Sequence, residues 1–545
     1  MPRCLAYLTV LLVAALLFAV PLRAADLGPL IDNLAEGGFK DTARAVDELA
    51  ATGDPDAVPV LSALLEGALY QRKSDKKVFR AEKVGRELQL FDPITGAPVD
   101  IVGKRAAEKI KVNNRLRKQI KGVLGTLTLV SPDPDQRRSG ADAVFKTPAP
   151  ENAHLLRAAI AKETDEAVQR RMQRALAAVT LRHDSDPAAR IAAVKTLGSF
   201  TDQEVRGVLS AVLLTDQDGS PLEADAQLRA AAATALAEVE SRLEFWAIAE
   251  SIFHGLSLGS VLLLAAIGLA ITFGVMGVIN MAHGEMVMLG AYTTFIIQEI
   301  IRATNPGLFD YSLFIAVPAA FLVAGAVGVG IERGVIRFLY GRPLETLLAT
   351  WGLSLILQQT VRSIFGPTNK EVGTPSWMSG ALEFDSGLVL TYNRLAIIFF
   401  ALAVLAILML LLRYTAFGLR MRAVTQNRGM ASAMGIRTGQ IDALTFGLGS
   451  GIAGMAGVAL SQIDNVSPNL GQAYIVDSFM VVVFGGVGNL WGTFFGGMSL
   501  GLVNKFLEPY AGAVLGKIIV LVAIILFIQR RPRGLFALKG RAVEN

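Results

Sequence analysis

Cysteine, histidine and charged residues are all scarce in this sequence. Its 545 residues include one cysteine and four histidines, and only 18% are Asp, Glu, Lys or Arg, whereas 52% are hydrophobic. A single cysteine excludes a disulfide scaffold, and a hydrophobic fraction this high excludes intrinsic disorder. The chain is also too apolar for an ordinary soluble enzyme.

The charges are unevenly distributed along the chain. Residues 1–250 carry 33 Lys/Arg and 34 Asp/Glu, whereas residues 251–545 carry 19 and 13. This change predicts a water-facing part followed by a lipid-facing part. The expected boundaries are 1–25 for a signal peptide or anchor, 26–245 for an extracytoplasmic domain, 246–536 for a membrane domain and 537–545 for a cytoplasmic tail.

The first 25 residues have the layout of a secretory signal. Arg3 precedes an apolar run over residues 5–20, and small residues follow Pro21. Arg23 makes the cleavage site imperfect, so an uncleaved anchor is the alternative. In both cases the positive end stays in the cytoplasm, and residue 26 onward lies outside it.

The water-facing part reads as short Ala/Leu-rich amphipathic helices. Asp-Pro pairs precede helical stretches, because Asp suits the cap and Pro suits the first turn. These pairs are Asp54-Pro55, Asp133-Pro134 and Asp186-Pro187. The clearest helical stretches are expected over residues 186–198, 202–214 and 228–243, and they resemble HEAT-type repeats.

One stretch of the water-facing part differs from the rest. Residues 88–101 are typical of a β-hairpin about a Pro/Gly turn. Residues 73–121 hold 14 basic and 6 acidic residues, which favours a solvated helix face over residues 104–121, with a contact for anionic lipid headgroups or a partner as the alternative. Because no aromatic residues are interleaved with these charges, single-stranded nucleic acid is not an expected partner.

Eight apolar segments in the lipid-facing part are long enough to cross a hydrocarbon core of about 30 Å. They cover residues 257–279, 281–301, 312–331, 346–361, 388–412, 441–461, 476–506 and 513–528. Arginine-rich clusters mark the cytoplasmic ends, because basic residues are enriched on that side. The clusters are Arg333, Arg337 and Arg342; Arg413, Arg420, Arg422, Arg428 and Arg437; and Arg530, Arg531, Arg533, Lys539 and Arg541.

The positions of these clusters fix how many segments cross. Starting outside, three crossings lead to the first cluster and two more to the second. The third cluster is cytoplasmic only if one remaining segment enters and leaves on the same side. Residues 476–506 are too long for one crossing and are interrupted by a glycine-rich stretch at 485–489, which predicts a re-entrant pair of half-helices. The predicted fold is an all-α polytopic membrane protein of about seven full crossings plus one re-entrant pair, with an N-terminal HEAT-like helical domain.

The loop over residues 414–440 carries the most informative motif. As a helix over residues 419–434 it places Ala423, Asn427 and Ala431 on one face, with Gly435 as a suitable helix end. A face of small residues lets another surface come close. The alternative is a helix that lies passively on the membrane surface.

Three polar residues, Asn280, His283 and Glu285, lie near the start of the second crossing. On a helix, Asn280 and His283 share a face and Glu285 points elsewhere. We favour a structural role in ordering the helix start, with gating as the alternative. No metal or cofactor is expected, because no second His or Cys lies at ligand spacing.

Residues 418–436 resemble the coupling loop of permease subunits of the branched-chain amino acid class of ABC transporters. Residues 277–285 (GVINMAHGE) and 288–292 (MLGAY) resemble the signature of that class. Residues 463–471 and 483–492, together with the long N-terminal extension, resemble more narrowly the first permease subunit of the urea ABC transporter. The resemblance covers nearly all of residues 256–536.

The resemblance implies a transport subunit in a bacterial inner membrane, with residues 26–245 in the periplasm. Its implied partners are a second related permease subunit, ATP-binding subunits and an extracytoplasmic solute-binding protein, besides membrane lipids and a small neutral solute. The implied ATPase-coupling residues are Gly418, Arg420, Arg422, Ala423, Asn427, Ala431 and Gly435.

Two glycine patterns do not bind nucleotides in this interpretation. Residues 512–518 have the wrong spacing for a phosphate-binding loop and place Ile518 where a hydroxyl is needed. Residues 449–454 match a dinucleotide pattern only formally, since they lie in an apolar helix, where Gly447 and Gly451 indicate close helix packing. ATP hydrolysis is therefore expected in separate subunits.

For the solute pathway we favour four neutral polar residues, Asn489 in the expected break and Thr350, Ser354 and Gln358 at i, i+4 and i+8 on the fourth segment. Such a stripe suits a small uncharged amide-like solute, and hydrogen bonding between helices is the alternative. The main hypothesis is ATP-driven import of urea, with a branched-chain amino acid or short amide as the alternative solute. A passive channel or sensor and a membrane-embedded hydrolase stay open as other classes.

Overall fold

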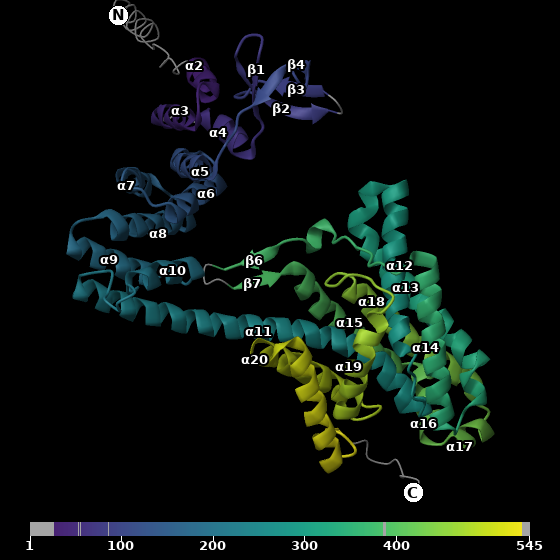
Figure 1. Ribbon diagram of the computed structural model, residues 1–545. Coiled ribbons are helices and arrows are strands. Elements are labelled where there is room, and N and C mark those ends of the chain that lie inside the picture. The colour runs from purple at the N-terminus through teal and green to yellow at the C-terminus, as the bar shows by residue number, and fades with distance from the viewer. Residues whose placement is uncertain (1–26, 53, 55, 85–86, 385–387, 537–545) are drawn as a thin grey trace, which may run out of the picture. The chain divides into compact units, whose positions relative to one another are not determined.

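The structure of the protein, a computed structural model, describes residues 27–52, 54, 56–84, 87–384 and 388–536. The expected signal segment, residues 1–25, and the expected tail, residues 537–545, lie outside the described residues. The chain divides into two compact units, which we call unit 1, ending at Leu243, and unit 2, beginning at Glu244. Figure 1 labels their helices and strands.

The described part of unit 1, from residue 27 onward, starts with three short helices. They are α2 (Leu27–Asp32), α3 (Phe39–Ala51) and α4 (Ala57–Glu66). Apolar side chains at helical spacing, such as Val46 and Leu49 of α3 and Leu61 of α4, are fully buried in one shared core. Helix α4 ends at Gly67, whose φ of +70° is the left-handed conformation typical of a helix end.

Five antiparallel strands follow, in the order β4-β3-β2-β1-β5. They are β1 (Leu69–Arg72), β2 (Val78–Val84), β3 (Glu87–Phe91), β4 (Pro98–Gly103) and β5 (Ala107–Lys109). The predicted hairpin over residues 88–101 is present as β3 and β4, where Leu90 lies opposite Asp100. Phe79, Leu88 and Leu90 are buried together against the sheet, as the two-residue period of a strand requires.

This sheet corrects two predictions. The all-α prediction is wrong for residues 69–109, because there the apolar residues alternate with charged ones and pair across strands. The helix face expected over residues 104–121 is divided between β5, which pairs with β1, and helix α5.

Helices complete unit 1. They are α5 (Asn114–Thr128), α6 (Pro134–Lys146), α7 (Asn152–Lys162), α8 (Glu166–His183), α9 (Pro187–Gly198), α10 (Gln203–Val212) and the first part of α11 (Ala226–Met276). Buried side chains of α6, α8, α9 and α11 share one core. The HEAT-type arrangement stays a prediction.

Two of the three predicted aspartate caps are present. Asp133 accepts the amide of Asp135 at 3.0 Å, and Asp186 accepts that of Ala188 at 3.0 Å. At the first Asp-Pro pair, Oδ1 of Asp54 likewise accepts the amide of Asp56 at 3.0 Å, but α4 begins only at Ala57 and its cap position is Asp56, which has no side-chain cap.

The described residues of unit 2 form the remainder of α11 and nine further helices. These are α12 (His283–Thr304), α13 (Ser312–Gly334), α14 (Pro343–Phe365), α15 (Tyr392–Tyr414), α16 (Ala416–Gln426), α17 (Arg428–Ala433), α18 (Thr438–Leu460), α19 (Leu470–Gly485) and α20 (Leu490–Arg530), with a small hairpin, β6 (Ala381–Glu383) and β7 (Val389–Thr391). Short 3-10 turns are present at Pro306–Tyr311, Ile336–Phe338 and Ser376–Met378.

Six helices among the described residues are long and apolar enough to cross a membrane. They are α11, α12, α13 with its flanking turns, α15, α18 and α20. Helix α14 is also 23 residues long but buries a polar face. A mostly helical polytopic membrane protein therefore agrees with the structure, whereas the count of seven crossings plus one re-entrant pair stays a prediction.

The core of unit 2 forms where glycines let helices come close. Helix α18 packs against α12 and α13, which run side by side (Figure 1). A methyl group on Gly447 would lie 2.6 Å from Cγ2 of Val329 in α13, and one on Gly449 would lie 2.6 Å from the carbonyl oxygen of Gly268 in α11. These distances confirm the close packing that was predicted for the glycines of this helix.

The predicted break within residues 476–506 is present. Helix α19 ends at Gly485 and α20 begins at Leu490, and between them Gly486 and Gly488 have φ values of +105° and +79°. The separation expected between residues 506 and 513 is present as a kink at Gly512, whose φ of +74° and ψ of +164° are non-helical. The label α20 therefore covers two helical parts, joined by a backbone conformation that glycine adopts without steric cost.

Candidate functional site

A buried polar site surrounds the start of α12. Asn280 is 1% exposed and precedes the helix, where its Oδ1 accepts the amide of Ala282 at 3.0 Å. His283, the first residue of α12, is fully buried, and its Nε2 lies 2.8 Å from the carbonyl oxygen of Ala265 in α11. The predicted shared helix face of Asn280 and His283 is wrong, because the helix begins only at His283.

The polar stripe on α14 meets this site. Thr350, Ser354 and Gln358 are all buried on one face of the helix, as the spacing predicted. Ser354 donates to Oε1 of Glu285 at 2.9 Å, and Thr350 accepts the amide of Met281 at 3.1 Å. The structure therefore brings Glu285, Ser354 and Thr350 together, although 69 residues separate Glu285 from Ser354.

At the other end of the stripe, two side chains converge on Asn469. Nε2 of Gln358 donates to Oδ1 of Asn469 at 3.1 Å, and Nη2 of Arg362 donates to the same atom at 2.9 Å. Asn469 immediately precedes α19. These hydrogen bonds join α14 to the start of α19.

Asn489 is not part of this site. Its Oδ1 accepts the amides of Trp491 and Gly492 at 3.0 and 3.2 Å, and its Nδ2 lies 3.5 Å from the carbonyl oxygen of Phe536. The side chain therefore caps α20. Its placement with the α14 stripe is wrong, because the glycine break turns it toward its own helix start and the C-terminal segment.

Several polar atoms of the site have no partner among the described residues. They are Nδ2 of Asn280, Nδ1 of His283 and Oε2 of Glu285. Buried polar atoms are normally hydrogen-bonded, so Asn280 offers an amide donor and Glu285 a carboxylate acceptor to water or to a solute. No group of three His, Cys, Asp or Glu suited to a metal ion is present in the described part of the chain.

A second region, which we call the coupling segment, covers residues 416–435 and contains α16 and α17. The single helix predicted over residues 419–434 is wrong, because Asn427 has an extended backbone and its Oδ1 accepts the amide of Met430 at 2.9 Å, which starts α17. Ala423, Asn427 and Ala431 therefore do not share an outward face, and Ala431 is buried. Gly435, with φ of +83°, does end the segment as expected.

Of the other predicted coupling residues, two contact the end of α15 and the third is exposed. Gly418 packs against Leu412, and a methyl group there would lie 2.6 Å from the Leu412 carbonyl carbon. Arg422 donates to the carbonyl oxygen of Leu412 at the end of α15. Arg420 is exposed.

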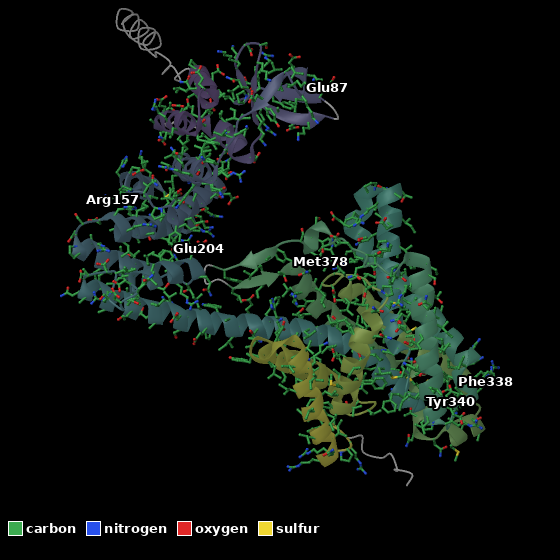
Figure 2. All side chains as sticks on the ribbon, viewed as in Figure 1. Glu87, Arg157, Glu204, Phe338, Tyr340 and Met378 are labelled. Carbon is green, nitrogen blue, oxygen red and sulfur yellow. The ribbon has the colours of Figure 1, made fainter. Side chains whose placement is uncertain are left out.

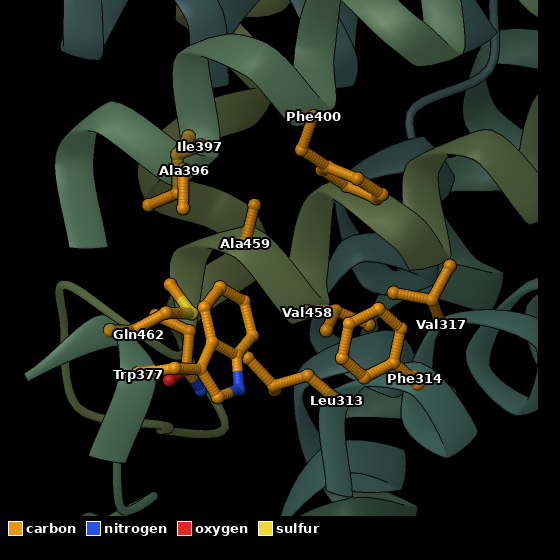
Figure 3. Close-up of a pocket in the computed structure, with 11 residues that line it drawn as sticks. Leu313, Phe314, Val317, Trp377, Ala396, Ile397, Phe400, Val458, Ala459 and Gln462 are labelled. Atoms are coloured by element: carbon orange, nitrogen blue, oxygen red, sulfur yellow. The ribbon is translucent and has the colours of Figure 1, made fainter. Parts of the chain in front are cut away.

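An apolar cavity lies elsewhere in unit 2, between α13, α15 and α18 (Figure 3). Its volume is about 310 Å³, and its walls are aliphatic and aromatic except for Gln462. None of the predicted site residues lines it. Walls of this kind suit hydrocarbon better than a small polar solute.

Comparison with known families settles the class of the protein. The family described as "Branched-chain amino acid transport system / permease component" matches residues 251–528, just over half of the chain, all within unit 2. The chain belongs to this family. It is therefore a multi-pass membrane permease component, a transport subunit rather than an enzyme.

Individual relatives agree with this permease assignment. The high-affinity branched-chain amino acid transport system permease protein LivH of Salmonella typhimurium (strain LT2) is 32% identical over 301 residues, which are 54% of this chain and 96% of that protein. LivH of Escherichia coli (strain K12) gives the same values. BraD of Pseudomonas aeruginosa is 30% identical over 298 residues, with the same coverage. No solved structure matches the chain significantly.

Several residues of this permease escaped the sequence interpretation. Asn469 is one, although its place next to Pro468 before a helix was a usable signal. Leu419, Met430 and Met434 are 63%, 61% and 77% exposed on the coupling segment, so that segment presents apolar side chains rather than the expected small ones. Arg428 entered only as one charge of a basic cluster, and its partners are described below.

Proposed function

We propose that the chain is the permease subunit of an ABC importer that carries urea across a bacterial inner membrane. The observation that carries this proposal is the buried polar site, in which neutral donors and acceptors on α14 meet a single carboxylate. Urea offers one carbonyl acceptor and several N–H donors. The unpartnered Nδ2 of Asn280 and Oε2 of Glu285 are complementary to those groups.

In this proposal, Asn280, Glu285, Thr350, Ser354 and Gln358 contact or gate the solute. Each is buried, and all except Asn280 have a hydrogen-bond partner on another helix or loop. A set of neutral hydrogen-bonding groups can pass a neutral amide without trapping it in a deep charge well. His283 holds the start of α12 against α11, and Asn489 holds the start of α20.

Energy is supplied by ATP-binding subunits that dock on the coupling segment. Arg420 and the exposed side chains of Leu419, Met430 and Met434 form the docking face, because exposed apolar side chains with neighbouring charge are typical of a protein interface. A second related permease and an extracytoplasmic solute-binding protein complete the importer. Unit 1, which lies on the extracytoplasmic side in this proposal, extends beyond the family match.

Branched-chain amino acids are the alternative solute, because LivH and BraD are named as permeases of branched-chain amino acid transport systems. An amino acid brings an ionised carboxylate, which needs a cationic partner. Arg362, on α14 itself, is the cation in the described residues that donates to Asn469, the partner of Gln358. The two solutes therefore differ in whether Arg362 is needed for binding.

Uptake in reconstituted vesicles tests the proposal. The complete complex, with ATP-binding subunits and binding protein, is given labelled urea or labelled leucine with and without ATP. Ser354→Ala should lower urea uptake roughly tenfold to a hundredfold, because a hydrogen bond to a charged group contributes about 1.5–3 kcal/mol. Thr360→Ala is the matched control, since Thr360 is exposed on α14 and bonds only to its own helix.

Each other result of this experiment favours a different class. ATP-dependent uptake of leucine alone, with loss in Arg362→Gln, would favour the branched-chain amino acid importer. Urea flux without ATP would favour a passive channel. Release of a cleaved product would favour a hydrolase. Equal uptake by Ser354→Ala and wild type would refute the assignment of the pathway residues.

A further inference from the structure

Four side chains link the coupling segment to α13 and α18, two other helices of unit 2. Arg428, the first residue of α17, forms an ion pair with Asp442 of α18, and its guanidinium carbon lies 4.6 Å from the centre of the Tyr340 ring. Tyr340, between α13 and α14, donates to Oε1 of Glu332 in α13 at 2.8 Å. Figure 2 labels Tyr340 at the end of unit 2 where α16 and α17 lie in Figure 1.

Burial makes Arg428 indispensable to this cluster. Asp442 and Glu332 are each 1% exposed, whereas the side chain of Arg428 is 43% exposed. Oδ1 of Asp442 has no hydrogen-bond partner in the described residues. Among those residues, Arg428 is therefore the group that balances the negative charge of the Asp442 carboxylate. A buried carboxylate without a paired cation is strongly unfavourable. Asp442 therefore holds Arg428 and, through it, the start of α17.

An arginine suits this position better than a lysine would. Its planar guanidinium can bind a carboxylate along one edge while its face stacks on an aromatic ring. Arg428 does both at once, to Asp442 and to Tyr340. One side chain thus connects α17 with α18 directly and with α13 through Tyr340 and Glu332.

Helices α13 and α18 are themselves closely packed. A methyl group on Gly454 of α18 would lie 2.6 Å from the carbonyl oxygen of Ala320 in α13. Helix α18 also packs against α12, whose first turn carries His283 and Glu285. Because such contacts leave little free space, a displacement of one helix is passed to its neighbours.

We propose that Arg428 is the positioning residue that transmits movement of the coupling segment to α13 and α18, and thereby to the polar site. This inference rests on the proposed function, in which ATP-binding subunits dock on that segment. The docking face and the link are distinct, since Leu419, Met430 and Met434 point outward and Arg428 is bound inward. Loss of the link should therefore leave docking intact and reduce only the transport obtained from each ATP.

The test measures ATP hydrolysis and solute uptake together in the complete reconstituted complex. We expect Arg428→Gln and Asp442→Asn each to keep hydrolysis within about twofold of wild type and to lower the solute transported per ATP roughly five- to a hundredfold. The double variant should lose little more than either single variant, because both remove the same link. Arg437→Gln is the matched control, since Arg437 lies just after the coupling segment, is exposed and has no side-chain partner in the described residues.

Spin labels give a second readout that needs no solute. Labels at Met430 of α17 and Leu444 of α18, which are 61% and 54% exposed, should give one narrow distance distribution in the wild type. The distribution should broaden in Arg428→Gln and stay partly narrow in Arg428→Lys, which keeps the charge but not the stacking. The exchange Arg428→Asp with Asp442→Arg tests the link where a single variant fails to fold.

Two results would overturn the proposal: a parallel fall of hydrolysis and uptake in Arg428→Gln, or an unchanged narrow distance between the labels. A wild-type complex that takes up neither urea nor leucine would refute the proposed function. The spin-label comparison would then decide the role of Arg428 by itself.

Discussion

Replacing Gly454 with alanine should weaken the crossing of α13 and α18. A methyl group at this position would lie 2.6 Å from the carbonyl oxygen of Ala320 and 2.7 Å from Cβ of Ala324, both on α13. Ala320 and Ala324 are fully buried. Because one of the contacted atoms belongs to the backbone of a packed helix, the clash is relieved only if one helix moves away from the other.

Two effects of opposite sign determine the expected free energy of unfolding. Overpacking of a tight interior costs about 1–3 kcal/mol. Alanine favours a helix over glycine by about 1 kcal/mol. Gly454→Ala should therefore be less stable than wild type by roughly 0–2 kcal/mol.

A control on the partner helix separates the two effects. Gly330 lies in α13, and a methyl group there would have no atom within 4 Å. Gly330→Ala should therefore gain helix propensity alone and be more stable than wild type by up to about 1 kcal/mol. Subtracting the two variants cancels the propensity and leaves the clash, about 1–3 kcal/mol.

The assay is unfolding of the purified protein in mild detergent by increasing dodecyl sulfate, followed by far-ultraviolet circular dichroism. The order of stability should be Gly330→Ala, then wild type, then Gly454→Ala. If the two variants differ by less than about 0.5 kcal/mol, the clash is absent and close packing of these helices does not stabilise unit 2.

Two further predictions concern a helix cap and an ion pair. Asn427→Ala should destabilise α17 by about 1 kcal/mol, because it removes the acceptor of the Met430 amide. The backbone amides of residues 428–434 should then exchange hydrogen faster than in the wild type, whereas Asn427→Ser should restore their protection. Equal exchange in the two variants would contradict the cap. In unit 1, the hydrogen bond from Arg137 at 2.7 Å holds the pKa of Glu163 below its ordinary value, so the pair stabilises the fold above that ordinary pKa and loses its effect as the pH falls through the lowered one. The difference in stability between wild type and Glu163→Gln can be measured from amide hydrogen exchange in α6 and α8, corrected for intrinsic rates. This difference should be constant above roughly pH 5 and shrink below roughly pH 4. A difference that persists at the lowest pH would contradict the stabilising role of the pair.

The apolar runs of the sequence determined the helices of unit 2 well. Helices α13 (Ser312–Gly334) and α18 (Thr438–Leu460) lie within a few residues of the predicted 312–331 and 441–461, because the thickness of the hydrocarbon core sets the length of a crossing. The break after α19 was equally readable, since consecutive glycines there adopt positive φ values. The polar face of α14 followed from the helical period alone.

The sequence patterns did not show where a segment expected to be helical forms a strand or where one helix is divided into two. In the sheet of unit 1, the sequence predicted the hairpin of β3 and β4 but missed β1, β2 and β5, and β1 pairs both with the neighbouring β2 and with the distant β5. At Asn427 the helical period continues through the residue, but its side chain caps the next turn and divides the helix.

Tertiary structure alone decided which polar side chains meet. The sequence showed that Glu285, Ser354 and Arg428 are polar residues on or beside apolar helices, and it assigned Arg428 only to a cytoplasmic charge cluster. It could not pair Glu285 with Ser354, or Arg428 with Asp442 and Tyr340. The physical reason is that a periodic pattern identifies the polar face of one helix, whereas the partner of that face depends on how the glycine-lined crossings of unit 2 bring distant helices together.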